Sequence, residues 1–365
     1  MRALFRVDAS IDIGSGHVMR CITLAKRLIA NGIECLFVSR EHTGNLFKTI
    51  VDNNIQLAPL PINRDGFDSK NLTHGFWLGC TVQQDVEETA EVIKNYKPDF
   101  IFIDHYAIDE DWEVSIRKIF CGLLIVIDDL HDRRHRCDIL IDQNFGRKIE
   151  DYESLVNPDC VLLIGSKYAI IRDEFLQQVK IAHNRRIAFK DIRQVLVTMG
   201  GVDQYNYTEK FLVFLSKLNL SPLCEVVIVV GRVFPHLESL KAKALQCHIS
   251  TKIIVNAQNM AELMATSDLA VGAIGSTTWE RCTMMLPTIN VSIAENQLQM
   301  AATLKKIDMV VLRGEEATFD EFFDAWHELI NNYCQQVDIA SNICDGQGLE
   351  RVYQKISNTV HRNIK

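Results

Sequence analysis

The chain has 365 residues, of which 47% are hydrophobic and 24% are charged, with a formal net charge of -8 at pH 7. This composition fits a globular protein with two sizeable cores, and the acidic balance argues against a nucleic-acid surface. There is no apolar run of about 18 residues and no signal peptide, so we expect a cytoplasmic protein without membrane insertion. The 11 cysteines never form a Cys-x-x-Cys pair, which indicates reduced thiols rather than disulfides or a zinc site.

The first half of the sequence alternates short apolar runs with stretches of helical periodicity. Apolar runs such as 100–103 and 123–127 are typical of parallel strands buried on both faces. Strands are expected at 3–7, 33–39, 100–103, 123–127, 139–141 and 161–164. Helices are expected at 18–29, 45–53, 82–96 and 168–182.

The charged segment 183–190 has little periodicity, and we place the linker there, within about ten residues. The domains are therefore expected at 1–183 and 184–365. A second alternating series follows, with strands at 194–198, 225–230, 252–255, 269–271 and 288–292. Its helices are expected at 208–218, 236–246, 260–265, 278–285, 297–306, 319–333 and 349–356. Two successive series of this kind predict an α/β protein with two Rossmann-like domains facing each other across a cleft.

The first glycine turn, at 14–16, joins the strand 3–7 to the helix 18–29. Glycines allow close backbone approach to a ligand, and a helix N-terminus attracts anions. His17 at this point carries the side chain that most readily moves a proton near neutral pH. Its position predicts a catalytic loop, and the alternative is a turn that only joins the strand to the helix.

The second domain contains two further glycine turns between a strand and a helix. One holds Gly200 and Gly201, and the other holds Gly275, Ser276, Thr277 and Thr278. Backbone N–H groups at a helix start, with Ser and Thr hydroxyls, bind a diphosphate without a lysine or a metal. Neither turn matches a Walker A motif or a full GxGxxG, so the prediction of a diphosphate site depends on both together.

Three side chains near these turns suit the rest of a nucleotide sugar. Glu280, one turn into the helix, can accept hydrogen bonds from two ribose hydroxyls, or it is an exposed carboxylate near the positive helix end. Asn296 and Gln297 follow the strand 288–292, and their amides suit hydroxyl and acetamido groups. The alternative for Asn296 is capping of the next helix.

Other candidate motifs have simpler interpretations. His131 and His135 are spaced like two metal ligands, but without a third ligand we interpret 131–135 as a solvated basic turn. The acidic triplet 109–111 matches a DxD metal motif and also fits a helix N-terminus, which we favour. Asp203 follows a glycine pair and is expected to stabilise that turn. We expect no catalytic metal.

Eleven short motifs, in order and over nearly the whole chain, resemble the PseG family, the nucleotide-sugar hydrolases of pseudaminic acid biosynthesis. They are RVDAS at 6–10, IGSGHVMR at 13–20, WLG at 77–79, DHY at 104–106, IDD at 127–129, CD at 137–138, GGVD at 200–203, GSTTWER at 275–281, LP at 286–287, AENQ at 294–297 and DGQG at 345–348. The glycine turns of the second half are shared with MurG-like glycosyltransferases.

The resemblance implies a GT-B architecture and hydrolysis of UDP-2,4-diacetamido-2,4,6-trideoxy-β-L-altropyranose to UDP and the free sugar, without a metal or cofactor. It implies that the C-terminal domain holds UDP, with uracil near 255–258, and that His17 activates water at the anomeric carbon. The residues implied at the sugar are Asp8, Tyr106, Tyr168, Asn296 and Gln297. Those implied at UDP are Gly14, Gly200, Gly201, Gly275, Ser276, Thr277, Thr278 and Glu280.

Two other functions remain open from the sequence. A MurG-like glycosyltransferase would move the sugar to an acceptor, for which the irregular segment 62–76 offers a place. A non-catalytic protein would only bind the UDP-sugar. The sequence also leaves open whether water attacks carbon or phosphorus, and we expect a monomer whose partner is a small-molecule UDP-sugar.

Overall fold

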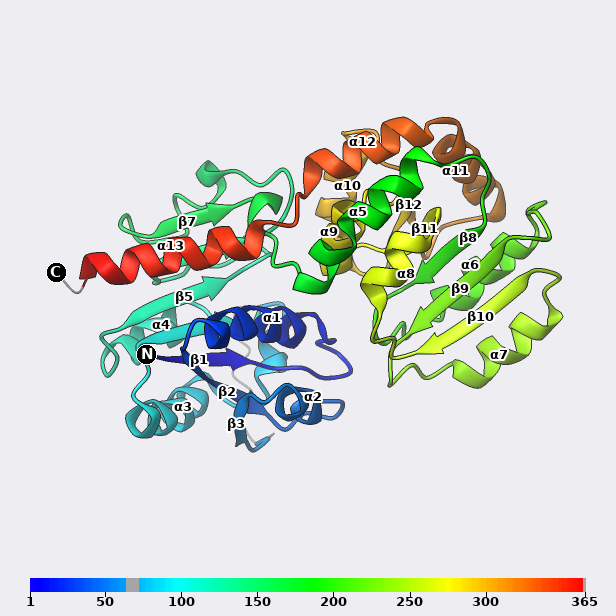
Figure 1. Cartoon of the computed structure of the whole chain (residues 1–365). Coiled ribbons are helices and arrows are strands. Elements are labelled where there is room, and N and C mark those ends of the chain that lie inside the picture. The colour runs from blue at the N-terminus through cyan, green and yellow to red at the C-terminus, as the bar shows by residue number, and fades with distance from the viewer. Residues whose placement is uncertain (64–71, 364–365) are drawn as a thin grey trace. The chain divides into compact units, whose positions relative to one another are not determined.

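The computed structural model describes residues 1–63 and 72–363, and Figure 1 shows their helices and strands. The chain forms two compact units, Met1–Ile170 with Gln347–Lys365, and Ile171–Gly346. Each unit contains one parallel β-sheet with helices on its faces. Within the described residues, no helix is both long and apolar enough to cross a membrane.

The first unit is built on a seven-stranded sheet in the order β3-β2-β1-β4-β5-β6-β7. The strands are β1 (Arg2–Val7), β2 (Glu34–Arg40), β3 (Gln56–Leu60), β4 (Phe100–Asp104), β5 (Leu123–Ile127), β6 (Ile139–Asp142) and β7 (Val161–Ile164). Its longer helices are α1 (Gly16–Ala30), α2 (Phe47–Asp52), α3 (Val82–Tyr96), α4 (Glu110–Arg117) and α13 (Gly348–Asn363). Short turns η1 (Gly75–Leu78), η2 (Ile149–Asp151) and η3 (Ser166–Tyr168) complete the unit.

The side chains of β1 alternate between two hydrophobic cores, one on each face of this sheet. Phe5 packs in the core that contains residues of α1 and α13, while Leu4 packs in the core that contains Trp112 of α4 and Ile93 of α3. A strand buried on both faces has mostly apolar side chains. In β1 the buried Arg6 is the exception, and its charge is paired with Asp8 and Asp85.

The second unit is built on a six-stranded sheet in the order β10-β9-β8-β11-β12-β13. The strands are β8 (Gln194–Thr198), β9 (Glu225–Val230), β10 (Ser250–Val255), β11 (Leu269–Ala273), β12 (Thr288–Ser292) and β13 (Val311–Arg313). The helices are α5 (Asp173–Ile187), α6 (Tyr207–Ser216), α7 (Leu237–Gln246), α8 (Met260–Thr266), α9 (Ser276–Thr283), α10 (Leu298–Lys305), α11 (Phe319–Asn331) and α12 (Tyr333–Ile343), with the short turn η4 (Glu295–Gln297). The predicted pair of Rossmann-like domains is confirmed.

The sequence did not predict β3, β13 or α12. Both strands lie at an edge of their sheet and are only partly buried, so they lack the continuous apolar run of a central strand. Pro59 also argues against a central strand in the sequence, because proline within a sheet is tolerated mainly in edge strands. The predicted helix at 319–333 ends at Asn331, and α12 begins at Tyr333.

The border between the units differs from the expected linker near residue 183. Helix α5 includes residue 183 and ends at Ile187, and its Arg185 pairs with Asp268 at 2.7 Å. Arg186 is buried and donates to the carbonyls of Met264 and Ser267, so charges that looked like a solvated linker are internal to the second unit. Helix α13 packs into a core of the first unit, which is therefore discontinuous in sequence.

Candidate active site

The central feature of the first unit is a polar network where β1 and β4 end. The two strands are parallel neighbours, and Val7 lies opposite Asp104 in the register. His17 is in the first turn of α1, which follows β1, and Asp104 is the last residue of β4. Adjacent parallel strands thus bring together two side chains that are 87 residues apart in sequence.

His17 and Asp104 form a close pair. Nδ1 of His17 lies 2.5 Å from Oδ1 of Asp104, and the His17 side chain is 9% exposed. A carboxylate only accepts hydrogen bonds, so this short contact favours a proton on Nδ1 over the longer approach of Nη2 of Arg20 to the same nitrogen, at 3.3 Å. With the proton on Nδ1, the neutral ring has a lone pair on Nε2. The arrangement provides an oriented base.

Arg20 holds this pair in place from one turn further along α1. Its Nε donates to Oδ2 of Asp104 at 2.5 Å and its Nη2 donates to Oδ1 at 2.6 Å, while Nη1 pairs with Asp129. Burial by itself would raise the pKa of Asp104, but the Arg20 guanidinium outweighs burial and holds that pKa below its usual range. Asp104 therefore stays ionised and keeps the His17 ring oriented.

Aromatic rings border His17. The ring of Tyr106 meets the imidazole edge to face, with centroids 4.5 Å apart, and its hydroxyl donates to Asp129 at 3.2 Å. Trp77 stacks on Tyr106 at 5.6 Å, and His74 lies 4.3 Å from Trp77. The structure thus brings the predicted Tyr106 next to His17 and adds two rings that the site prediction did not include.

Asp8 has an interior position that differs from the expected contact with the sugar. Its side chain is 0% exposed. The carboxylate accepts hydrogen bonds from Arg6 at 2.7 Å, from the backbone N–H of Arg40 at 2.6 Å and from His105 at 3.0 Å. Asp8 therefore joins β1, β2 and the loop after β4 from inside and offers no open oxygen to a ligand.

Gly14 also differs from its expected role at UDP. Its backbone N–H donates to the carbonyl of Ser10 at 2.9 Å, and its φ of 80° is in the left-handed region that favours glycine. Because its N–H is already used inside the loop, Gly14 shapes the turn before α1 rather than offering a donor to phosphate.

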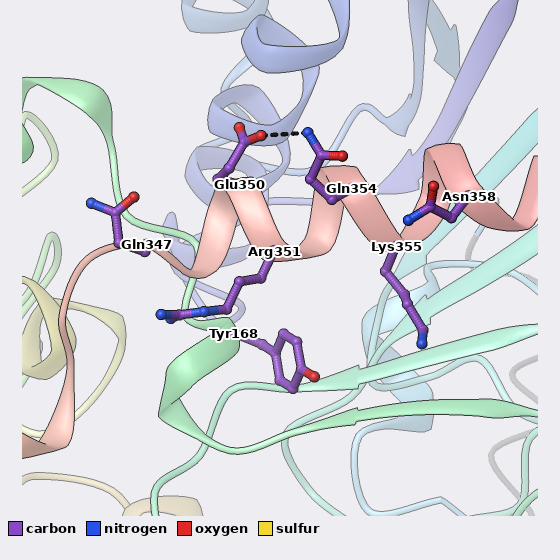
Figure 2. Close-up of a pocket in the computed structure, with 7 residues that line it drawn as sticks. All are labelled: Tyr168, Gln347, Glu350, Arg351, Gln354, Lys355 and Asn358. Carbon is purple, nitrogen blue, oxygen red and sulfur yellow. Dashed lines mark hydrogen bonds between the residues drawn. The ribbon is translucent and has the colours of Figure 1, made fainter.

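Tyr168 lies apart from the His17 network, in η3 after the edge strand β7. It lines a pocket of about 310 Å³ along α13, whose lining shares no residue with that network. Figure 2 shows the Tyr168 ring below the helix. The other lining residues are Gln347, Glu350, Arg351, Gln354, Lys355 and Asn358.

In the second unit, three neighbouring strands carry the predicted nucleotide residues at one edge of the sheet. The turn with Gly200 and Gly201 follows β8, and the turn with Gly275 follows β11. Asn296 and Gln297 lie in η4 after β12. Since β8, β11 and β12 are adjacent and parallel, their carboxyl ends meet at the edge where open α/β sheets bind ligands.

The turn before α9 has the features of an anion site. Gly275 and Ser276 are exposed, and Thr278 is buried with its Oγ1 accepting the N–H of Gly275 at 3.1 Å. The first N–H groups of a helix have no partner within it, so Ser276 and Thr277 present donors at the positive end of α9.

Glu280 is an enclosed carboxylate rather than an exposed one. Its side chain is 12% exposed, and Oε1 accepts from Nε of Arg172 at 3.0 Å. Oε2 is buried and has no hydrogen-bond partner in the described part of the chain. Burial raises the pKa of Glu280 in spite of the Arg172 charge, and one oxygen is left for a donor such as a ribose hydroxyl.

Two polar side chains in these loops have local roles. Asp203 accepts the N–H groups of Tyr207 and Thr208 at 2.9 and 2.7 Å, which confirms that it stabilises the turn before α6. Oε1 of Gln297 accepts the N–H of Ile293 at 2.8 Å and closes its own loop, whereas the neighbouring Asn296 is exposed.

The prediction of a solvated basic turn at 131–135 is wrong for two of the five residues, although Asp132 and Arg134 are exposed. His135 is 1% exposed and its Nδ1 lies 2.7 Å from Glu113, while Arg133 is also buried and pairs with Asp128. The triplet 109–111 does begin a helix, because Asp109 caps α4. No group of three or more His, Cys, Asp or Glu that could hold a metal ion occurs within the described ranges.

The sequence did not predict the roles of Asp104, Arg20 and Trp77, although each lies in one of the motifs that resemble the PseG family. The available signals were the position of Asp104 at the end of an apolar run and the spacing of Arg20 three residues after His17, which places both on one helix face. Neither signal says which carboxylate the histidine meets, since that depends on strand order.

Solved structures with the same arrangement of elements define the class of fold. MurG of Acinetobacter baumannii superposes with a TM-score of 0.71 at 13% identity, covering 98% of this chain and 99% of that one. A UDP-GlcNAc 2-epimerase of Neisseria meningitidis, solved with UDP-GlcNAc, superposes with a TM-score of 0.58 at 12% identity, covering 98% and 100%. The protein has the MurG-like GT-B fold.

A curated protein gives a more particular similarity. The chain is 28% identical over 306 residues to UDP-2,4-diacetamido-2,4,6-trideoxy-β-L-altropyranose hydrolase of Campylobacter jejuni, covering 84% of this chain and 97% of the hydrolase. The predicted resemblance to the PseG family is thereby confirmed. An uncharacterised protein of Methanocaldococcus jannaschii is 27% identical over 90% of the chain, which spans 63% of that protein. No protein-family model matches the chain.

Proposed function

We propose that this protein hydrolyses a UDP-linked 2,4-diacetamido-2,4,6-trideoxyhexose of the altrose type to UDP and the free sugar, without a metal. The observation that carries the proposal is the pair of His17 and Asp104, a carboxylate-oriented imidazole whose Nε2 can accept a proton. The similarity to the Campylobacter jejuni hydrolase, over 97% of its length, supports this substrate class.

In the proposed reaction, Nε2 of His17 removes a proton from water as the water oxygen bonds to the anomeric carbon. The bond from that carbon to the UDP oxygen breaks, and its electron pair leaves with UDP. Asp104 and Arg20 are positioning residues, because they hold the ring through Nδ1. A positioned general base contributes about 10²–10⁴-fold to the rate.

We propose that the second unit holds UDP through Gly200, Gly201, Gly275, Ser276, Thr277 and Thr278, with Oε2 of Glu280 accepting from the ribose. The exposed turn before α9 and the unpartnered oxygen of Glu280 support this assignment. Tyr106, Asn296 and Gln297 remain the proposed sugar contacts. Asp8 and Gly14 are not included, because their polar atoms already make hydrogen bonds inside the first unit. Tyr168 is not included, because it lines the separate pocket along α13.

The central test is UDP release from the diacetamido UDP-sugar by the purified protein without an acceptor. We expect His17→Ala to lower turnover by about 10²–10⁴-fold and to leave the UDP dissociation constant within about twofold, because His17 acts on water. His135→Asn is a matched control, since it also breaks a buried histidine–carboxylate pair in the first unit. Wild-type turnover in His17→Ala would refute the assignment of the base.

The same assay separates the alternatives. UDP release only after an acceptor is added would identify a glycosyltransferase, whose suggested acceptor segment 62–76 lies partly outside the described residues. Binding without turnover would identify a binding protein. Reaction in ¹⁸O-labelled water tests the site of attack, because we expect the label in the free sugar, and label in UDP would mean attack at phosphorus.

A further inference from the structure

Arg281 lies in α9 directly beneath the exposed turn of Gly275 and Ser276. The residue is 1% exposed. Its Nη2 donates to the carbonyl of Ala273 at 2.9 Å and to Oγ1 of Thr278 at 3.2 Å, and its Nη1 donates to Oγ1 of Thr277 at 3.2 Å. The guanidinium thus joins the end of β11 to the first turn of α9.

In residues 1–63 and 72–363, Arg281 makes no ion pair with a carboxylate, although the charge of the neighbouring Glu280 offsets part of the effect of burial on its pKa. Its remaining hydrogen bond goes to the amide oxygen of Asn290 at 3.2 Å, so all of its acceptors are neutral, and Nε has no partner among the described residues. Within the part of the chain that the structure describes, no carboxylate lies in ion-pair distance of Arg281. Burial lowers the pKa of Arg281 to about 10, which reflects the cost of this enclosed charge.

Other buried arginines differ in how their charge is balanced. In the first unit, Arg6 and Arg20 pair with aspartates. Arg186 of the second unit donates to carbonyls at the C-terminal ends of α8 and α9, where the helix dipole is negative. Arg281 is in the last turn of α9, but its side chain extends back along the helix, and its guanidinium contacts Oγ1 of Thr277 and Thr278. Its charge therefore lies at the first turn, where it adds to the positive end of the helix dipole.

The hydrogen bonds of Arg281 also direct a neighbouring hydroxyl. Because Oγ1 of Thr277 accepts from Nη1, its own hydrogen is available to an acceptor outside the cluster. Thr277 is partly exposed. A buried cation, a helix N-terminus and an outward hydroxyl donor therefore converge on the same turn.

We propose that Arg281 is a buried counter-charge that raises the affinity of this turn for a diphosphate without touching it. The inference rests on the proposed function, since it assigns the UDP diphosphate to the turn before α9. Arg281 is a positioning residue here: it acts through its field and through the hydroxyl of Thr277. The loss of ligand affinity on removal of Arg281 should therefore increase with the negative charge of the ligand.

The wild type and Arg281→Met are each titrated with UDP, UMP and uridine, and binding is monitored by NMR of the ligand. We expect the dissociation constant of UDP to rise roughly tenfold or more and that of UMP to rise less, as expected for a charge a few ångströms away. We expect the constant of uridine to stay within about twofold. The UDP effect should shrink with added salt.

Two further variants separate charge from packing. Arg281→Lys keeps the cation and should preserve the ratio of UDP to uridine affinity better than Arg281→Met. Arg186→Met removes a buried guanidinium at the opposite end of α9 and should lower thermal stability without changing that ratio. Equal losses for UDP and uridine in Arg281→Met, or no loss in either, would overturn the proposal. Absence of UDP binding by the wild type would instead refute the proposed function.

Discussion

The polar clusters of the two units balance charge in different ways. In the first unit, Arg20 lies between Asp104 and Asp129, so a buried cation is surrounded by carboxylates that fix the position of His17. In the second unit, Arg281 is surrounded by neutral acceptors next to an exposed helix start. A balanced network suits the orientation of a proton-transfer group, whereas an unbalanced charge suits the binding of an anion.

Of the variants that test this comparison, Asp104→Asn is expected to have the largest effect, which is a loss of turnover. An amide at this position no longer requires the proton on Nδ1 of His17, so the ring loses its fixed tautomer and orientation. We expect turnover to fall by about 10²-fold or more, with the affinity for UDP unchanged, as measured by UDP release and by titration.

Asp85→Asn is the matched control for Asp104→Asn. Asp85 is also a fully buried carboxylate of the first unit, bound by Arg6 and Arg40, and it has no contact with His17. Both variants weaken a buried ion pair and should lose stability, since removing one partner of such a pair costs about 3–5 kcal/mol. Equal turnover in the two variants would contradict a special role for Asp104.

A second prediction concerns the acidic residues around Asp129. Asp142 is buried and accepts from Tyr152 and from Nε of Arg147, both at 2.9 Å. Burial, together with the charge of Asp129, raises the pKa of Asp142 to about 7 from an ordinary 3.8. The folded state therefore binds this proton more tightly than the unfolded state, and the contribution to stability is lost as pH rises from about 4 to 7.

Asp142→Asn should remove this pH dependence, because the amide stays neutral at every pH. Relative to the variant, the wild type should lose up to about 3 kcal/mol of unfolding free energy between pH 5 and pH 8, at about 1.4 kcal/mol per unit of pKa shift. Urea unfolding at the two pH values measures the difference. Parallel stability curves for the two proteins would mean that Asp142 does not titrate in this range.

The smallest effect is expected for Gly272→Ala in the second unit. A Cβ at position 272 would lie 2.6 Å from Nη1 of Arg281, so the guanidinium must move within a packed interior. Overpacking of this kind costs about 1–3 kcal/mol. We expect UDP affinity to fall several-fold while uridine affinity changes little, as measured by the same titrations. Unchanged binding of UDP would show that the position of Arg281 tolerates this shift.

Much of the fold was predictable because parallel strands buried on both faces have continuous apolar runs. Strands such as β5 (Leu123–Ile127) and β8 (Gln194–Thr198) lie at the predicted residues. Edge strand β3 has a partly exposed surface and a proline, so its sequence lacks that run. The charged segment 183–190 looked like a linker because periodicity does not reveal that Arg186 has internal carbonyl acceptors.

The sequence alone determined the order of the central strands and of most helices, the glycine turns and the choice of His17 as a candidate base. Only the tertiary structure decided that His17 meets Asp104, that Asp8 is interior and that Arg281 lies beneath the turn before α9. Local periodicity records which face of an element is buried, but it does not record which strands are neighbours. The partner of His17 depends on β1 lying beside β4, and that pairing is a property of the folded sheet.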